Sequence, residues 1–147
     1  MRVYLSGEIH TNWRDQIITA CADLNVTFDG PVTDHGASDD CGVLILGTEA
    51  DKIWHDHKGA QLNAIRTRNG IEQADIIVVR FGDKYKQWNA AFDAGYAAAL
   101  GKSLIVMHGP DNQHALKEVD AAALVVAETP QQVAAALRYV LTSVVPT

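Results

Sequence analysis

Residues 75–80 read Asp-Ile-Ile-Val-Val-Arg, a short run that is apolar on both faces. Strands of this kind are covered by helices on each side, as in parallel sheets. Two further apolar runs follow, at 103–107 and 122–126. Before them, shorter runs at 3–5 and 26–28 carry the same β-forming residues. The sequence therefore predicts five strands.

Helical patterns separate these strands. Apolar residues recur at helical spacing over 13–24 and 58–69, and the second pattern ends at Asn69-Gly70, a pair typical of a helix stop. Further helices are expected at 89–100, at 112–118 and from Thr129-Pro130 onward. Strand and helix alternate, so we expect an α/β fold with one doubly wound five-stranded parallel sheet and helices on both faces. Residues 29–54 show weak periodicity and are expected to form a long, helix-free connection.

The composition of the chain limits the classes of protein to which it can belong. The 147 residues fit a single domain over 1–147, and 48% apolar with 20% charged residues is ordinary globular composition. Twelve basic and eighteen acidic residues give a net charge of −6, with no basic block, which argues against binding to polymeric nucleic acid. No apolar run is long enough to cross a membrane. Two cysteines, Cys21 and Cys41, are expected to be reduced thiols in a cytoplasmic protein.

Polar residues follow three of the predicted strands, where ligands bind in open α/β sheets. These segments are Ser6-Gly-Glu-Ile-His10, Phe81 to Asn89 and Met107-His-Gly-Pro110. The helix after the second segment carries Asp93, which we place in or near its first turn, where the macrodipole favours an ionised, nucleophilic carboxylate. The alternative is that Asp93 only complements the dipole. Gly95, inside the same helix, calls for close packing or a ligand nearby.

The remaining sequence patterns do not match the motifs of common cofactor-binding sites. The glycines match neither a phosphate loop nor a dinucleotide fingerprint, and no nucleophile elbow occurs, so no cofactor is expected. His55 and His57 could chelate a metal with Asp56 or with residues of the 35–41 segment, but their spacing matches no zinc signature, and helix capping explains them equally well. We therefore expect no metal. Cys41 lies beside Asp39 and Asp40, whose charges disfavour a thiolate.

The motifs together resemble the nucleoside 2-deoxyribosyltransferase superfamily. The segments concerned are Met1 to Gly7, the strand at Asp75, and Phe92-Asp93-Ala-Gly95-Tyr96-Ala-Ala-Ala-Leu-Gly101-Lys102. The sequence from Val79 to Tyr96 and that of residues 33–42 resemble the YtoQ branch of this superfamily. The resemblance to this branch covers nearly the whole chain. The resemblance implies a flavodoxin-like sheet and cleavage of an N-glycosidic bond in a nucleoside or nucleotide by a carboxylate nucleophile.

The same resemblance implies roles for single residues. Asp93 takes the position of the nucleophilic glutamate, and Tyr4, Ser6 and Gly7 match the segment that lines the pocket. Asp83 lies near the position of the family's second acidic residue and is the candidate acid or base. From the residues themselves, Trp88, Asn89 and Gly95 are further candidates for the pocket. Aspartate is shorter than glutamate by one C–C bond, about 1.5 Å. Where the family has a small, glycine-rich segment before the nucleophile, this sequence has the bulky residues Gln87-Trp88-Asn89. Where the family has a further acidic residue, this sequence has Thr67. Alternatives are an N-glycosidase that uses water, and a non-catalytic nucleotide-binding module.

The helix at 89–100 also suggests that the protein forms oligomers. The helix at 89–100 carries six alanines, more small residues than one core-facing stripe needs. A second helix could approach its free face closely, although alanine is also simply a strong helix former. Family resemblance implies a pocket completed by a neighbouring subunit. We therefore expect a homodimer or larger homo-oligomer with Asp93 near the interface.

Overall fold

The computed structural model describes residues 1–145 and 147, without the side chains of residues 52, 54 and 55. Its centre is one sheet of five parallel strands, confirming the predicted fold class. The strands are β1 (Arg2–Gly7), β2 (Thr27–Asp29), β3 (Ile76–Arg80), β4 (Ser103–Met107) and β5 (Val125–Ala127), in the spatial order β2-β1-β3-β4-β5. This is the flavodoxin-like order, whose reversal point lies between β1 and β3.

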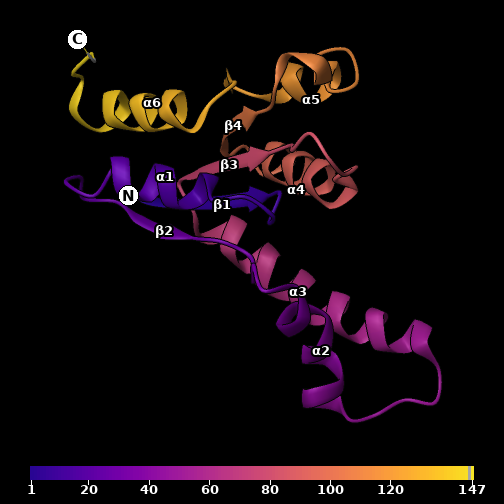
Figure 1. Ribbon diagram of the computed structural model, residues 1–147. Helices are drawn as coiled ribbons and strands as arrows, with labels where there is room; N and C mark the ends of the chain where they lie inside the picture. The colour runs from indigo at the N-terminus through magenta and orange to yellow at the C-terminus, as the bar shows by residue number, and fades with distance from the viewer. Residues whose placement is uncertain (146) are drawn as a thin grey trace.

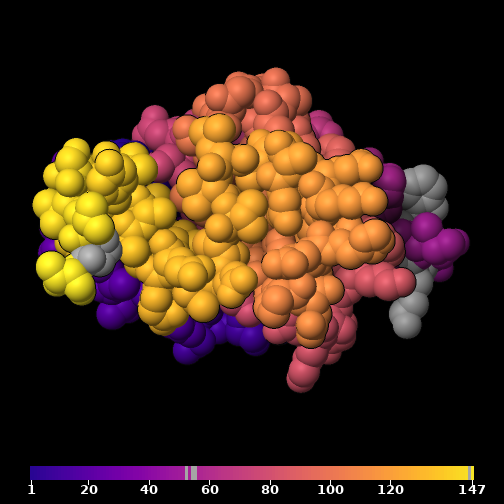
Figure 2. Space-filling model, turned by 90° about the horizontal axis from the view of Figure 1, so that it is seen from above, coloured from indigo at the N-terminus to yellow at the C-terminus, as the bar shows by residue number. Residues whose placement is uncertain are grey.

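Helices cover both faces of the sheet because alternate strand residues point to opposite sides. Val3, Leu5 and Val78 pack beneath α1 (Trp13–Ala20) and α6 (Pro130–Thr142). Ile77 and Val79 face the other layer. That layer consists of α4 (Trp88–Ala99), α5 (Lys117–Ala122) and the end of α3 (Lys52–Gln73). Seen from the side of α5 and α6, the C-terminal third of the chain covers much of the molecule (Figure 2).

The expectation of a helix-free connection over 29–54 is wrong. The segment contains α2 (His35–Leu46), and α3 begins at Lys52 rather than at 58. Asp34 caps α2 by accepting a hydrogen bond from the Ala37 N–H, and Asp51 caps α3 in the same way through Ile53. Figure 1 shows α2 and the first half of α3 extending beyond the sheet as a hairpin. The periodicity of α2 is weak because most of its residues contact no core.

Glycines set the close approach of the two hairpin helices. A Cβ at Gly42 would lie 2.4 Å from the backbone nitrogen of Gly59, and one at Gly59 would lie 2.9 Å from the Asp39 carbonyl oxygen. Side chains at these positions would force the helices apart. The hairpin therefore depends on glycine where α2 crosses α3.

Four further elements have bounds that differ from the sequence-based expectation. The helix expected to stop at Asn69-Gly70 continues to Gln73, because Gly70 packs against the ring of Tyr4 instead of adopting a left-handed turn. The fifth strand is Val125–Ala127 rather than 122–126, and α5 is Lys117–Ala122 rather than 112–118. Helix α1 ends at Ala20 rather than at 24. No helix within the described residues is long and apolar enough to cross a membrane.

Candidate functional site

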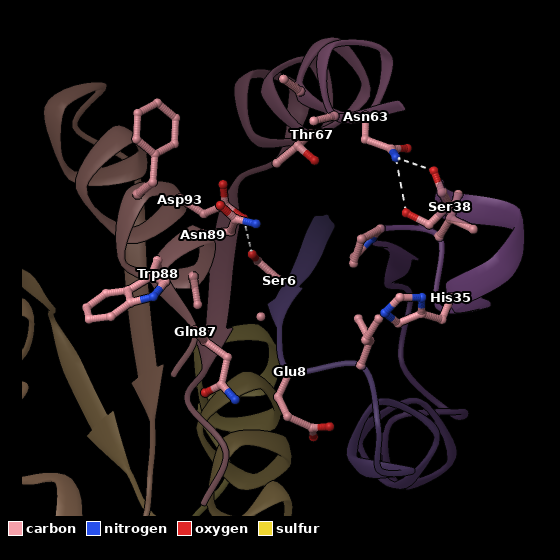
Figure 3. A pocket seen from close by; sticks show the side chains of 18 of the residues that line it. Ser6, Glu8, His35, Ser38, Asn63, Thr67, Gln87, Trp88, Asn89 and Asp93 are labelled. Carbon is pink, nitrogen blue, oxygen red and sulfur yellow. Dashed lines mark hydrogen bonds between the residues drawn. The ribbon is translucent and has the colours of Figure 1, made fainter. Parts of the chain in front are cut away.

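A cavity of about 610 Å³ opens at the carboxyl ends of β1 and β3, within the size range of small-molecule sites. One wall is the loop after β1, a second is the segment leading into α4, and the third is the α2–α3 hairpin (Figure 3). The strand-end position is the one predicted. The hairpin wall is new, since its α2 helix was not expected. Ser38 and Asn63 belong to that wall.

Ser6 and Asp93 meet at the inner side of this cavity. The Ser6 hydroxyl, which is 1% exposed at the end of β1, donates a hydrogen bond of 2.5 Å to Oδ2 of Asp93 (Figure 3). Asp93 is the sixth residue of α4 and so lies just beyond its first turn. Burial raises the pKa of the Asp93 carboxyl, and the Ser6 hydrogen bond opposes that rise. Ser6, rather than the helix dipole, is the group that stabilises the ionised form.

The end of β1, which carries Ser6, is fixed in position by the close packing of Gly7 and by hydrogen bonds from Arg14. Gly7 has φ +102°, and a Cβ there would lie 2.1 Å from the Arg80 carbonyl oxygen, so glycine is required. Arg14, which is buried, donates from Nε to the carbonyl of Leu5, from Nη2 to Gly7 and from Nη1 to Glu8, at 2.9, 3.1 and 2.6 Å. These bonds bracket Ser6 on both sides. Burial lowers the pKa of the Arg14 guanidinium to about 10, so it stays cationic at neutral pH.

Glu8 is a buried carboxylate at the cavity that we did not predict as a site residue. It accepts hydrogen bonds from the His10 N–H and the Thr11 hydroxyl, and its Oε2 lies 3.4 Å from Nε of Arg80. Burial acts to raise the pKa of Glu8, but these hydrogen bonds and the Arg80 charge outweigh it and hold the pKa below its usual value. Figure 3 shows the carboxylate turned away from Asp93. Glu8 therefore anchors the loop, and its position after a buried strand was the available signal.

Tyr4 lies behind the cavity wall rather than on it. Its ring is 2% exposed and packs on Gly70, and its hydroxyl hydrogen-bonds Thr67, which does line the cavity. Burial raises the pKa of the Tyr4 phenol, so the group is neutral at physiological pH. Tyr4 thus fixes the position of Thr67, while Thr67 itself faces the cavity (Figure 3).

The start of α4, together with the segment before it, forms one wall and contributes two of the predicted residues. Trp88 and Asn89 line the cavity, and Gln87 holds the segment by accepting a 2.7 Å hydrogen bond from the Gly82 N–H. Asp83 is exposed, does not line the cavity, and points toward Gly109, so the structure does not bring it together with Asp93. The structure gives no support to Asp83 as the acid or base.

Gly95 also lies outside the cavity. It is exposed, and a Cβ built there would meet no described atom within 4 Å, so the close approach expected at this position is not found among the described residues.

The candidate metal residues are dispersed. His35 pairs with Asp39 at 2.9 Å, and the Cys41 thiol donates to the Ser38 carbonyl, both on α2. His57 lies near Gln61, one turn along α3, while the side chain of His55 lies outside the described residues. Among the side chains described, no three His, Cys, Asp or Glu residues are placed to hold a metal ion.

Gly70 and Gly95 make a matched pair for a stability test. Both lie inside helices, yet a Cβ at Gly70 would be 2.3 Å from the Tyr4 ring and one at Gly95 would meet open space. We expect Gly70→Ala to lower the free energy of unfolding by about 1–3 kcal/mol through overpacking. In contrast, Gly95→Ala should raise it by about 0.5–1 kcal/mol, the difference in helix propensity. Urea titration measures both, and equal shifts would contradict this packing.

Comparisons with known proteins agree with the architecture. A model of the family described as nucleoside 2-deoxyribosyltransferase YtoQ matches residues 4–141. The chain is 42% identical over 139 residues to the uncharacterized protein YtoQ of Bacillus subtilis (strain 168), a match that covers 93% of this chain and 94% of the relative.

Solved structures share the fold at low sequence identity. The 2-deoxyribosyltransferase of Bacillus psychrosaccharolyticus is 15% identical with a TM-score of 0.56, covering 91% of this chain and 90% of its own. The CMP N-glycosidase BcmB of Clostridium botulinum is 12% identical with a TM-score of 0.54, covering 96% of this chain and 100% of its own. The family match spans most of the chain, and the protein belongs to the YtoQ family of nucleoside 2-deoxyribosyltransferase-like proteins.

Proposed function

We propose that this protein breaks the N-glycosidic bond of a nucleoside or nucleotide, with Asp93 as the nucleophile. The observation that carries the proposal is a cavity of ligand size in which the Asp93 carboxylate is bonded only by the Ser6 hydroxyl, among the hydrogen bonds of the described residues. Its fold neighbours include a 2-deoxyribosyltransferase and a CMP N-glycosidase, which supports the reaction class.

In the proposed reaction, an oxygen of Asp93 attacks the anomeric carbon. The C–N bond breaks, its electron pair leaves with the base, and a glycosyl ester of Asp93 remains. A second base then displaces the ester in a transferase, or water does so in a hydrolase. Trp88 and Asn89 on the cavity wall would contact the substrate, and Gly7 lets it approach the loop after β1.

Product analysis tests this proposal. The protein is incubated with deoxynucleosides and with nucleotides, with and without an acceptor base, and the products are separated by chromatography. Exchange of the base indicates a transferase, and free sugar indicates a hydrolase. Saturable binding without turnover over hours would contradict catalysis and favour the nucleotide-binding module.

The Ser6 hydrogen bond gives a prediction for pH dependence. Attack requires ionised Asp93, so activity is lost as the pH falls through the raised pKa of this group. Ser6→Ala removes the bond that lowers this pKa. The acidic limb of the rate profile should therefore move to higher pH. Ser38→Ala is the matched control, since that hydroxyl contacts Asn63 on the opposite wall, and it should leave the limb in place. Equal profiles for all three proteins would exclude the assigned role of Ser6.

We further propose a homodimer with α4 at its interface. Trp88 and Phe92 are 74% and 60% exposed, and with Gly95 and Ala99 they lie on one face of α4. A second copy seated there would cover apolar surface beside the cavity. Gly95→Arg should dissociate the pair. Sedimentation equilibrium measures this, and a 15.9 kDa monomer at micromolar concentration for the unmodified protein would exclude it.

The location proposed from the sequence is the cytoplasm. Cys21 and Cys41 are free thiols in the structure, which supports a reducing compartment.

A further inference from the structure

The groups around Asp93 cannot supply a proton near neutral pH. Ser6 and Thr67 are hydroxyls, Asn89 is an amide, and the Tyr4 phenol behind Thr67 has its pKa raised by burial. In Figure 3, Asn89 and Ser6 lie next to the Asp93 carboxylate. Amides and alcohols donate hydrogen bonds but do not transfer protons readily in this pH range.

The other carboxylates of the cavity are either held in hydrogen bonds and ion pairs or lie far from Asp93. Glu8 is kept ionised by its hydrogen bonds and is directed away from Asp93. His35 and its partner Asp39 belong to the hairpin wall, and His35 lies across the cavity from Asp93 (Figure 3). Asp56 lies eleven residues before Thr67 on α3, which is about 16 Å along the helix.

The remaining titratable groups of the cavity lie on the loop after β1, on the segment before α4 and on α3. The His10 N–H donates a hydrogen bond to the Glu8 carboxylate, and the His10 ring packs against that of Tyr85 in a tilted arrangement, with centroids 4.8 Å apart. The Lys86 ammonium lies 5.6 Å from the centroid of the Trp88 ring, and Arg66 is exposed. Among the described cavity residues, none is thus placed as a general acid beside Asp93.

With no general acid beside Asp93 among the described cavity residues, the charge of the leaving base decides how easily it departs. A neutral base departs as an anion unless a proton reaches it, and a positioned acid is worth about 10²–10⁴-fold in rate. A base that is already cationic needs no proton, because the electron pair of the breaking C–N bond neutralises it. We propose that the preferred substrates are N-glycosides of positively charged bases, such as N7-alkylated purines or pyridinium compounds. This inference rests on the proposed function.

The step balances without another reactant. Asp93 forms the bond to the anomeric carbon, the C–N bond breaks, and its electron pair leaves a neutral base. Water then hydrolyses the glycosyl ester, releasing the sugar and one proton.

The surroundings of Asp93 favour such a cation. No Lys, Arg or His contact to the Asp93 carboxylate is found among the described residues, so its charge is available to the substrate. The exposed rings of Trp88 and Phe92 border the cavity, and aromatic faces attract cations, as Lys86 over Trp88 illustrates. A bound cation would also lower the pKa of Asp93 and so ionise its own nucleophile.

Guanosine and 7-methylguanosine provide a matched test, each as riboside and 2-deoxyriboside, at mildly acidic pH where the methylated base is charged. We expect kcat/KM to be higher for the methylated nucleoside by about 100-fold or more, the contribution of a missing acid. A smaller ratio overturns the inference but leaves the proposed function intact. Absence of turnover with any of these substrates and with the unmodified deoxynucleosides and nucleotides overturns both.

A second test places an acid where the wall has a hydroxyl. Thr67→Asp should raise turnover of guanosine by about 10-fold or more over the isosteric Thr67→Asn, because only the first can protonate the base. Equal rates in two folded variants would mean that a proton is already supplied elsewhere, which overturns the inference. Circular dichroism checks folding, and if either variant fails to fold, the substrate ratio of the unmodified protein decides.

Discussion

Asp93→Asn is expected to abolish turnover and at the same time to stabilise the fold. The substitution removes the nucleophilic oxygen and should reduce kcat by at least about a thousand-fold, as loss of a nucleophile does in other enzymes. Burial raises the pKa of Asp93, so the folded state favours the protonated form and ionisation costs stability. Asparagine removes that cost.

The sign of the stability effect depends on pH. At neutral pH the Asp93→Asn variant should melt at a higher temperature than the unmodified protein. The difference should shrink as the pH falls through the raised pKa, where the carboxyl of the unmodified protein is itself neutral. Calorimetry across this range measures it. A folded variant that keeps full turnover would remove Asp93 from the reaction.

Arg14→Met is expected to have the largest effect on stability. The guanidinium satisfies three carbonyls around Ser6, and methionine would leave those acceptors buried without a partner. An unsatisfied buried group costs about 1–3 kcal/mol, so we expect a loss of roughly 3 kcal/mol or more in the free energy of unfolding. The bond from Ser6 to Asp93 should loosen with the loop, and activity should fall in any molecules that remain folded.

Two further variants separate charge from geometry. Arg14→Lys keeps the cation but not the planar fork, and should be intermediate. Arg138→Met is the control, because Arg138 makes a two-bond ion pair with Asp23 on the surface, and such pairs contribute little. If Arg14→Met and Arg138→Met lower the melting temperature equally, the three carbonyl contacts do not have the assigned importance.

The sheet was predictable because its signal is local. The apolar run at Ile76–Arg80 and its neighbours could only be buried strands, and alternation with helices determined that they are parallel. Helix α2 was missed for the opposite reason. It projects from the core, so its apolar residues form no stripe, and Leu44 and Ile45 remain exposed. Its stability depends on the Gly42–Gly59 crossing, which no periodicity reveals.

The candidate site was predictable only in part. Ser6 and Asp93 were each expected, from strand-end position and from family resemblance, but their hydrogen bond joins residues 87 positions apart. Arg14 was missed because charged residues near a helix start usually face solvent. Glu8 lies in a segment that was expected at the site, but its burial and its bonds to His10 and Thr11 depend on how the loop folds. Asp83 follows β3 as a site residue would, yet its loop turns it toward Gly109. Side-chain direction in a loop is determined by tertiary contacts, which one sequence does not show.

Trapping the glycosyl-enzyme tests the central claim most directly. A 2-deoxy-2-fluoro nucleoside slows breakdown of the ester, so the intermediate accumulates and can be located by peptide mass spectrometry. We predict one added fluoroglycosyl group on the peptide that contains Asp93, and none in Asp93→Asn. Turnover with no adduct, or an adduct on another residue, would contradict the account.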